Sequence, residues 1–328
     1  MRLTLSETRT LAIEAMTRLG FPREDCAITA DHLTDAAARG LTFGGLPRIL
    51  AIKERLEEYG SHRVPIRIEH ETSNSAQLNG GDNVGYVVAH RVTTLAIEKA
   101  KRSGIAIVGA NNTYYTGIFA HYLEMATREN LIAMAAGNGP AFTAPYGARE
   151  SRLGTNPIAF GFPTTGDPII WDIGTCAIMQ GELMLHARLG EMIAEGIALD
   201  KEGNPTRDPL AALTGAILAW GGHRGSGLSV VVQLLGILCD TPAIPIGLKE
   251  MGFLFLTIDP SLLMPTERFK ERATELAEAI RSAAPVKDGP AVRMPFDRSA
   301  AQRRRSLQEG VDVPDAVYAA LLRLIGKT

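Results

Sequence analysis

Strand-like apolar runs alternate with helix-like segments in the centre of the chain, and this alternation restricts the fold more than any other feature. A helical pattern over residues 87–102 leads into IAIVGA (105–110), and another over 118–130 leads into LIAMAAGN (131–138). Strand after helix after strand predicts βαβ-like units and a partly parallel sheet. Further strands are expected at PIIWDIG (168–174) and GFLFLTID (252–259), and a buried helix at GLSVVVQLLGILC (227–239).

Both ends of the chain have a different character, because apolar residues recur there at helical spacing. Three helices are expected before residue 60 and three more after residue 265. The predicted fold class is therefore mixed α/β, with helical termini packed on a central mixed sheet. We predict two domains. Residues 1–70 plus 265–328 form a helical domain from both termini, and residues 71–264 form a central α/β domain.

Composition excludes several classes of protein. Of 328 residues, 45% are hydrophobic and 21% charged, which is an ordinary globular balance. The formal charge of −2 gives no general attraction to nucleic acid or to an anionic membrane. No uninterrupted apolar run reaches the roughly 18 residues of a membrane span. The three cysteines are far apart and lack metal-ligand spacing, which indicates structural thiols, a reducing compartment and no metal site. We expect a cytoplasmic protein without nucleic-acid or membrane partners.

Two segments could contact a cofactor. The glycine-rich run 221–227 precedes an apolar helix, where free N–H groups and Arg224 can bind phosphate. It matches neither the Rossmann fingerprint nor the P-loop, so a tight, closely packed turn is the alternative. Asp172 ends an apolar strand before Gly174. A carboxylate there can hold a ribose hydroxyl or cap a helix.

Two further segments are candidates for a site. Residues 137–156 form a long region rich in Gly, Pro, Thr and Asn, and loops of this length are often functional. RGLTFGGLPRILAI (39–52) joins two helices through glycines and a proline and places Arg48 directly after them. No zincin pair of histidines and no G-x-S-x-G elbow is present, so nothing indicates metal-dependent proteolysis or acyl transfer.

Several of these segments resemble one family in order and spacing. GTNPIAFG (154–161), WDIGT (171–175), LDKEGNPTRDPLAAL (199–213) and GGHRGSGLS (221–229) are similar to segments of the malate/L-lactate dehydrogenase type 2 family. That family includes ureidoglycolate, sulfolactate and 2,3-diketogulonate oxidoreductases, and Δ1-piperideine-2-carboxylate and Δ1-pyrroline-2-carboxylate reductases. The resemblance implies a non-Rossmann NAD(P)-binding fold, a homodimer, NADPH or NADH as cofactor, and a small carboxylate as substrate. It makes 71–264 the cofactor-binding domain.

The resemblance also implies roles for individual residues. Arg48 matches an arginine that binds the substrate carboxylate, which suits a guanidinium fork. Thr155 matches a threonine that faces the substrate. The positions that match cofactor-binding residues are Gly139, Asp172, Ile173, Gly174, His223 and Arg224.

Departures from the family pattern concern the catalytic groups. Phe43 and Gly44 stand where the family has the Ser and catalytic His of S-H-G, so Gly44 marks a substrate-binding position without its imidazole. Tyr115 stands where the family has a second His. Reducing a ketone needs a proton donor, whereas an iminium is already protonated on nitrogen. Glu182 stands where the imino acid reductases carry Asp. The catalytic candidates are therefore Glu182, Tyr115, Arg48 and Thr155.

These observations favour an NAD(P)H-dependent reductase of a small 2-imino carboxylate, with cyclic ones such as Δ1-pyrroline-2-carboxylate or Δ1-piperideine-2-carboxylate preferred. One alternative is a malate- or lactate-like 2-hydroxyacid dehydrogenase. The other is a cofactor-binding pseudoenzyme that lacks the catalytic His.

Overall fold

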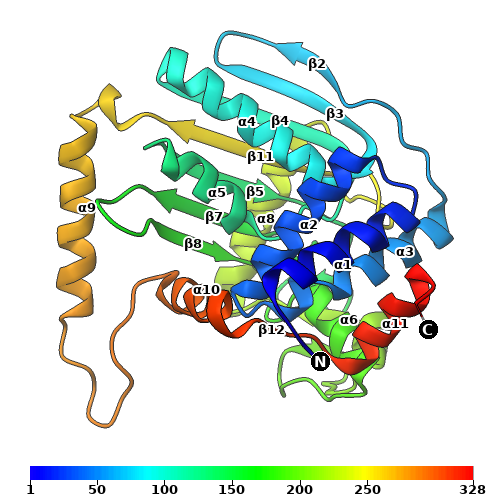
Figure 1. Ribbon diagram of the computed structural model, residues 1–328. Coiled ribbons are helices and arrows are strands. Elements are labelled where there is room, and N and C mark those ends of the chain that lie inside the picture. Colours follow the sequence, from blue (N-terminus) through cyan, green and yellow to red (C-terminus); the bar gives the residue numbers. More distant parts are fainter. Residues whose placement is uncertain (328) are drawn as a thin grey trace.

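A seven-stranded mixed sheet forms the centre of the computed structural model, which describes residues 1–327 (Figure 1). β3 and β4 are parallel neighbours, and every other neighbouring pair in this sheet is antiparallel. The predicted mixed α/β fold is confirmed. In spatial order the strands are β2 (Arg67–Glu71), β3 (Ser75–Val84), β4 (Ile105–Tyr114), β11 (Met251–Ile258), β5 (Ile132–Gly137), β7 (Ile158–Phe162) and β8 (Ile169–Ile173).

One of the two predicted βαβ units joins neighbouring strands, and the other joins strands that are separated by a third. β3, α4 (Gly85–Ser103) and β4 make a parallel crossover between neighbours, as predicted. α5 (Phe119–Arg128) connects β4 to β5, but β11 lies between these two strands and is antiparallel to both. β4, β5 and β8 therefore run in the same direction and end at the same edge of the sheet.

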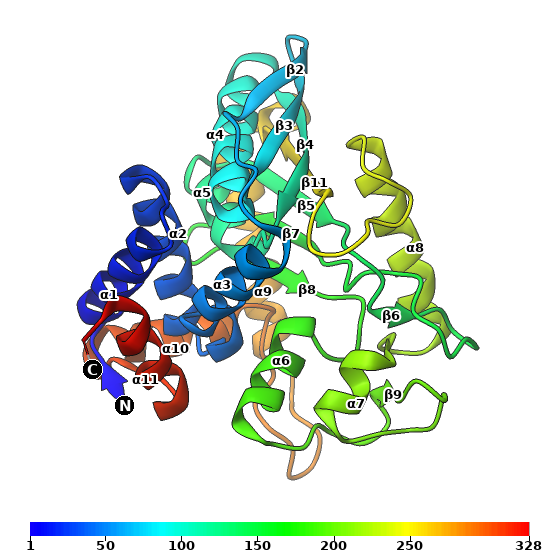
Figure 2. The same cartoon turned by 90° about the vertical axis from the view of Figure 1, so that its right-hand side faces the viewer.

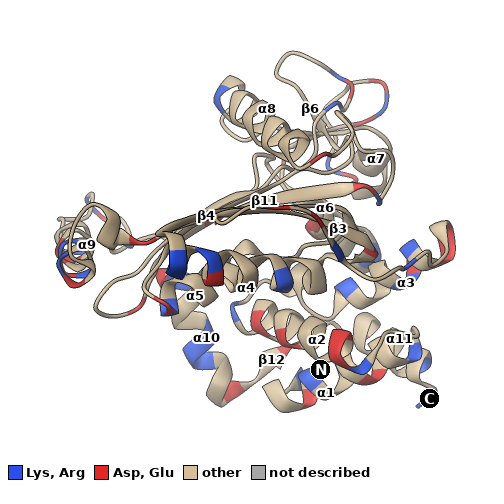
Figure 3. Cartoon of the chain, turned by 90° about the horizontal axis from the view of Figure 1, so that it is seen from above, with Lys and Arg blue, Asp and Glu red and all other residues tan. Residues whose placement is uncertain are grey.

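Helices cover both faces of the sheet (Figure 3). α4 and α5 lie on one face, α1 (Leu5–Arg18) and α2 (Arg23–Ala38) lie beyond them, and α3 (Pro47–Tyr59) lies at the end of this layer (Figures 2 and 3). α8 (His223–Leu238) packs on β5 and β11 from the opposite face (Figures 2 and 3). The sheet and α4–α5 enclose the core between them.

α8 differs from the buried helix that the sequence predicted. It begins at His223, so the glycine-rich run forms its first turns rather than a turn before it. One side packs on the sheet through Ser229, Val232 and Gly236, whereas Leu234 and Leu238 are 58% and 65% exposed. The single chain therefore buries only one side of α8, and this side carries small and polar residues at helical spacing, Ser226, Ser229, Gln233 and Gly236, whereas Leu234 and Leu238 face outward.

The two termini lie side by side (Figures 1 and 2). β1 (Arg2–Leu3) pairs with β12 (Val311–Asp312), α1 contacts α11 (Asp315–Ile325), and α10 (Asp297–Glu309) contacts α2. α9 (Thr266–Arg281) lies apart from these helices, beside the β7–β8 hairpin, where Thr165 N donates to Thr274 Oγ1 at 3.1 Å. The division into two domains, with α9 in the helical one, stays a prediction.

The remaining elements are short and were largely not predicted. Over residues 1–327, no helix has both the length and the apolar character that a membrane crossing requires. A three-stranded sheet is formed by β6 (Thr143–Ala144), β10 (Ala216–Leu218) and β9 (Ala198–Leu199), and the other helices are η1 (Thr42–Gly44), α6 (Gln180–Leu189), α7 (Pro209–Thr214) and η2 (Pro260–Leu262).

Candidate active site

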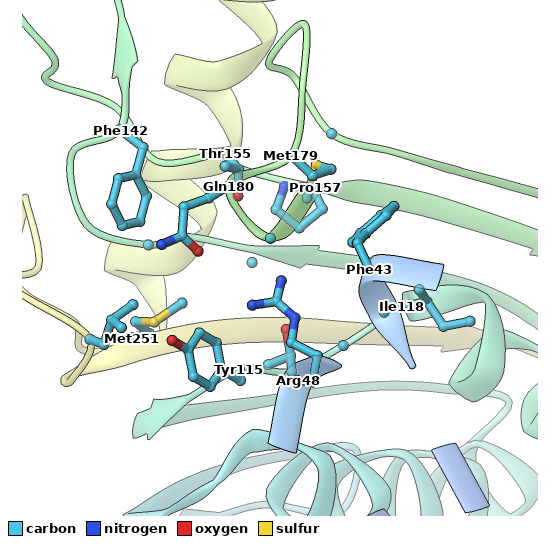
Figure 4. A pocket seen from close by; sticks show the side chains of 18 of the residues that line it. Phe43, Arg48, Tyr115, Ile118, Phe142, Thr155, Pro157, Met179, Gln180 and Met251 are labelled. Carbon is cyan, nitrogen blue, oxygen red and sulfur yellow. The ribbon is translucent and has the colours of Figure 1, made fainter. Parts of the chain in front are cut away.

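A cavity of about 190 Å³, here called the inner pocket, opens at the sheet edge where β4, β5 and β8 end (Figure 4). Gly117 follows β4, Gly139 follows β5, and Gly174 follows β8. The carboxyl ends of strands commonly hold ligands in α/β sheets. Gly44 of η1 and Arg48 of α3 close the pocket from the N-terminal helices. The segment 39–52 thus reaches the site that its glycines and arginine suggested.

Arg48 points into the inner pocket (Figure 4). Among the described lining residues it is the one cation. Its Nη1 is buried and has no hydrogen-bond partner within residues 1–327. The guanidinium carbon lies 5.0 Å from the ring centre of Tyr115. A partly desolvated guanidinium without a partner is a binding group for a ligand anion.

Tyr115 lies beside Arg48 and holds an unusual backbone conformation, with φ of 55°. Its hydroxyl is buried without a hydrogen-bond partner. Burial raises the pKa of the phenol, and the nearby charge of Arg48 opposes that shift in part. The hydroxyl is therefore protonated at neutral pH and can donate a hydrogen bond to a ligand.

The wall next to Gly44 is apolar. A Cβ built on Gly44 would lie 3.3 Å from Ala36 Cβ and 3.7 Å from Ile118 Cγ2, so these two side chains occupy the space beside it. Phe43 and Leu41 extend the same wall. In the part of the chain that the structure describes, no histidine lines the inner pocket.

Two histidines lie behind this wall. His32 Nε2 accepts a hydrogen bond of 2.9 Å from the backbone N–H of Ile118, and complete burial lowers the pKa of the ring. His121 Nδ1 lies 2.9 Å from Asp35 Oδ2. His32 therefore holds the wall in place as a neutral ring.

Asp172, the last but one residue of β8, lines the inner pocket. Its carboxylate accepts a 2.8 Å hydrogen bond from Ala120 N, in the first turn of α5. Burial raises its pKa to about 6, although the N–H groups of Ala120 and Phe119 oppose the shift. Of the two roles that the sequence left open, this geometry shows helix capping, but of α5 rather than of the segment that follows Asp172.

The residues matched to cofactor-binding positions fall into three places. Gly139, Asp172 and Gly174 line the inner pocket. Ile173 packs beneath α8 with Ile158 and Val232, and His223 and Arg224 are exposed at the start of α8.

The inner pocket and the start of α8 are linked by a backbone hydrogen bond, and the pocket can accept a planar ring. Trp220 N, just before α8, donates to Thr175 O, just after β8, at 3.2 Å. A Cβ on Gly174 would overlap Met179 Sδ, so Met179 packs directly on this backbone, whereas a Cβ on Gly139 would meet only Met251 Cε, at 3.3 Å, and its backbone is open to the pocket. Backbone surfaces of glycine allow a planar ring to approach closely. These residues therefore fit a nicotinamide ring in the inner pocket with the rest of the cofactor leading towards α8.

Of the two remaining predicted residues, one lines the inner pocket and the other, on α6, does not. Thr155 lines the inner pocket, whereas Glu182 lines neither this cavity nor its neighbour. Gln180, which the sequence did not single out, lines both, and its amide faces the space in front of Arg48 (Figure 4). Residues two apart on a helix point to different sides. Because the side chain of Gln180 faces the pocket, that of Glu182 faces away from it. The start of α6 at Gln180 is the information that would have identified Gln180 as a pocket residue.

Comparisons with known proteins agree on one family. The family model of malate/L-lactate dehydrogenase matches residues 3–322. The malate/(S)-sulfolactate dehydrogenase of Methanothermus fervidus is 35% identical over 324 residues, covering 95% of this chain and 94% of that protein. The Δ1-pyrroline-2-carboxylate/Δ1-piperideine-2-carboxylate reductase of Pseudomonas aeruginosa is 32% identical over 342 residues, covering 99% of both.

A solved structure shares the whole architecture. The crystal structure of a dehydrogenase from Sinorhizobium meliloti superposes with a TM-score of 0.91 at 28% identity, covering 99% of this chain and 98% of that one. The family match, the two relatives and this structure all cover nearly the full length. The chain therefore belongs to the malate/L-lactate dehydrogenase family and is an oxidoreductase that uses a nicotinamide cofactor.

Proposed function

We propose that this protein reduces a small 2-imino monocarboxylate, such as Δ1-pyrroline-2-carboxylate or Δ1-piperideine-2-carboxylate, with NADPH or NADH. The observation that carries the proposal is a pocket with one unpaired guanidinium, Arg48, and no imidazole among the described lining residues. A bound nicotinamide would supply hydride to C2. The iminium brings its own proton on nitrogen, whereas a ketone requires a donor for the forming alkoxide.

The charge of the pocket supports a monocarboxylate over a dianion. Malate and sulfolactate, named for several relatives, carry a second acid group. Arg48 matches one carboxylate, and the inner pocket offers no second cation within residues 1–327. The other charged lining residue is Asp172, which would repel a second anion. An unpaired anion in such a pocket is costly.

Each side chain has a defined task in this proposal. Arg48 binds the carboxylate through two N–H groups and fixes the orientation of C2. Thr155 and Gln180 hydrogen-bond the substrate, and the Tyr115 hydroxyl donates to it. Phe43 and Ile118 exclude water from the ring. Glu182, the residue that the sequence suggested for the substrate nitrogen, lines neither described cavity, so Gln180 takes the place beside the substrate in this proposal.

Steady-state assays test the proposal directly. Purified protein is assayed with NADPH and with NADH against Δ1-pyrroline-2-carboxylate, pyruvate, oxaloacetate and sulfopyruvate. We expect kcat/KM for the imine to exceed that of every 2-oxo acid by at least about 100-fold, the scale of a general acid contribution. Turnover of a 2-oxo acid without turnover of the imine would refute it.

A pseudoenzyme is the second candidate, because both family imidazoles are replaced, by Gly44 and Tyr115. Thermal-shift titration with NADPH and NADH separates the two. Cofactor binding without turnover of any substrate favours the pseudoenzyme.

We also propose a homodimer. The outward side of α8 exposes a run of apolar side chains that nothing in the described chain covers, and such patches commonly mark interfaces. A second copy is the proposed partner, and light scattering of the purified protein tests it. The exposed residues are Val230, Val231, Leu234, Ile237 and Leu238.

The cytoplasm is the compartment we propose. Cys26, Cys176 and Cys239 are buried free thiols, which suits a reducing environment. Labelling of the thiols in protein extracted from its native cells under acid quench would show them reduced.

A further inference from the structure

A second cavity, here called the outer chamber, adjoins the inner pocket and has a volume of about 550 Å³. α3, α6 and the loop 244–248 supply its other walls. Of the residues matched to cofactor-binding positions, Gly139, Asp172 and Gly174 line the inner pocket, and none of the six lines the chamber. The two cavities share the lining residues Tyr115, Pro140, Phe142, Gln180 and Leu248.

The chamber has a largely apolar lining, and one of its two glutamates, Glu54, is paired with Arg188 at 2.5 Å. Its charged lining residues are Glu54, Arg55 and Glu58, of which the two glutamates are exposed. Arg55 is buried, and its guanidinium pairs with Asp82 and donates to Leu248 O at 3.1 Å and Gly60 O at 3.2 Å. Arg55 is therefore not available to a ligand. The apolar residues found in the chamber but not in the inner pocket are Ala51, Ala141, Met184, Ile244, Pro245 and Ile246.

The loop wall of the chamber is held in position. Arg55 holds the Leu248 carbonyl, and Gly247 adopts φ of 65° against Tyr59. A Cβ on Gly247 would lie 2.5 Å from the Tyr59 hydroxyl, so this close contact requires glycine. The chamber therefore exists before a ligand arrives.

We propose that the outer chamber binds the side chain of the substrate, and that this side chain is an extended apolar group without a negative end. This inference rests on the proposed function, because Arg48 must hold the carboxylate. The inner pocket has to contain both the nicotinamide ring and the reacting carbons in about 190 Å³. A longer substituent on C3 therefore extends past Tyr115 and Gln180 into the chamber. The lining there is apolar, and no described lining residue offers a free cation to a negative end, because Arg55 is paired with Asp82.

A ladder of carboxylates tests the chamber without turnover. Acetate, butanoate, hexanoate and the dianion adipate are titrated into protein with saturating NADPH, and the apparent Kd is taken from thermal shifts. We expect affinity to rise about threefold per methylene from acetate to hexanoate. Adipate should bind at least tenfold more weakly than hexanoate. A flat ladder, or equal binding of adipate and hexanoate, would overturn the proposal.

Variants locate this binding. Ala141→Phe fills the chamber without altering a lining residue of the inner pocket, and should remove the gain beyond butanoate. Ile246→Lys, at a position that is 77% exposed and tolerant of change, should invert the preference so that adipate exceeds hexanoate. Leu263→Lys adds the same charge at a 93% exposed leucine outside both cavities and is the matched control.

The outcomes separate this inference from the proposed function. A ladder that survives in both Ala141→Phe and Ile246→Lys places the apolar binding elsewhere and refutes the chamber. The carboxylate series measures binding, so a protein that reduces no imine can still bind the longer acids more tightly. If the protein reduces imines but binds all the acids equally, the proposed function stands and only the role of the chamber is refuted.

Discussion

The guanidinium of Arg48 occupies the space in which a side chain on Gly181 would begin, and a Cβ built there would overlap Nη2. A residue of α6 thus sets the position of a cation on α3, across 133 residues of sequence. The absence of a side chain at position 181 is as necessary to the proposed carboxylate site as the presence of Arg48.

Replacing that glycine tests the relationship. Gly181→Ala should displace the guanidinium and raise KM for the carboxylate substrate about tenfold, with a smaller change in kcat, because a positional shift weakens a two-point hydrogen bond. Gly227→Ala is the control, since it also lies in a helix but has nothing within 4 Å of its Cβ position. Equal KM values for both variants would show that Arg48 adjusts freely.

Gln180 and Glu182 can be ranked by paired variants. Since Gln180 lines the inner pocket and Glu182 does not, Gln180→Leu should lower kcat/KM about tenfold or more, the scale of one hydrogen bond to a substrate. Glu182→Gln should change it less than about threefold. The reverse order in kinetic assays would restore Glu182 to the role that the sequence predicted.

Tyr115 should separate stability from activity. Tyr115→Phe removes a buried hydroxyl that has no partner, so the free energy of unfolding should stay within about 0.5 kcal/mol or rise. kcat/KM should nevertheless fall about tenfold if that hydroxyl donates to the substrate. Urea denaturation and steady-state kinetics on one preparation measure both quantities. A loss of stability with unchanged kinetics would contradict the proposed donor role.

Asp172 gives a pH-dependent prediction. Its pKa of about 6 in the folded protein exceeds the ordinary value of 3.8, so the folded state holds the proton more tightly between these values. The contribution of Asp172 to stability therefore falls as pH rises from about 4 through 6, and the ionised group destabilises the fold at neutral pH. Asn also caps helices but carries no charge.

The free energy of unfolding of Asp172→Asn, relative to that of the wild type, should therefore rise by about 2 kcal/mol from pH 4 to pH 7.5. Denaturant unfolding at both pH values measures this change. A difference in stability between the two proteins that is constant with pH would show that the carboxyl of Asp172 has the same pKa in the folded and the unfolded protein.

The sequence predicted the elements better than their partners. The helices near residues 87–102 and 118–130 and the strand at 105–110 have clear periodic patterns, and the structure contains them. Nothing local indicates that β11 separates β4 from β5, because the pairing of strands depends on segments more than 100 residues apart. The buried side of α8 was missed because it carries Ser226, Ser229, Gln233 and Gly236 rather than the apolar residues that usually mark a buried side.

The candidate site shows the same division. Arg48, Thr155 and the glycines at the strand ends were found by resemblance and lie together in one pocket. The partner of Asp172 is a backbone N–H 52 residues earlier in the chain, which no pattern of side chains can show. Gln180 was missed because its orientation depends on where α6 begins.

The central position of β11 also determines when the site can form during synthesis. β11 is the last strand of the large sheet to be translated, yet both β4 and β5 hydrogen-bond to it. Until residue 258 has left the ribosome, the strand ends that carry Tyr115 and Gly139 belong to two unjoined parts of a sheet with open edges. A nascent chain stalled earlier would expose these edges to aggregation or to chaperones, and it could not yet hold a substrate.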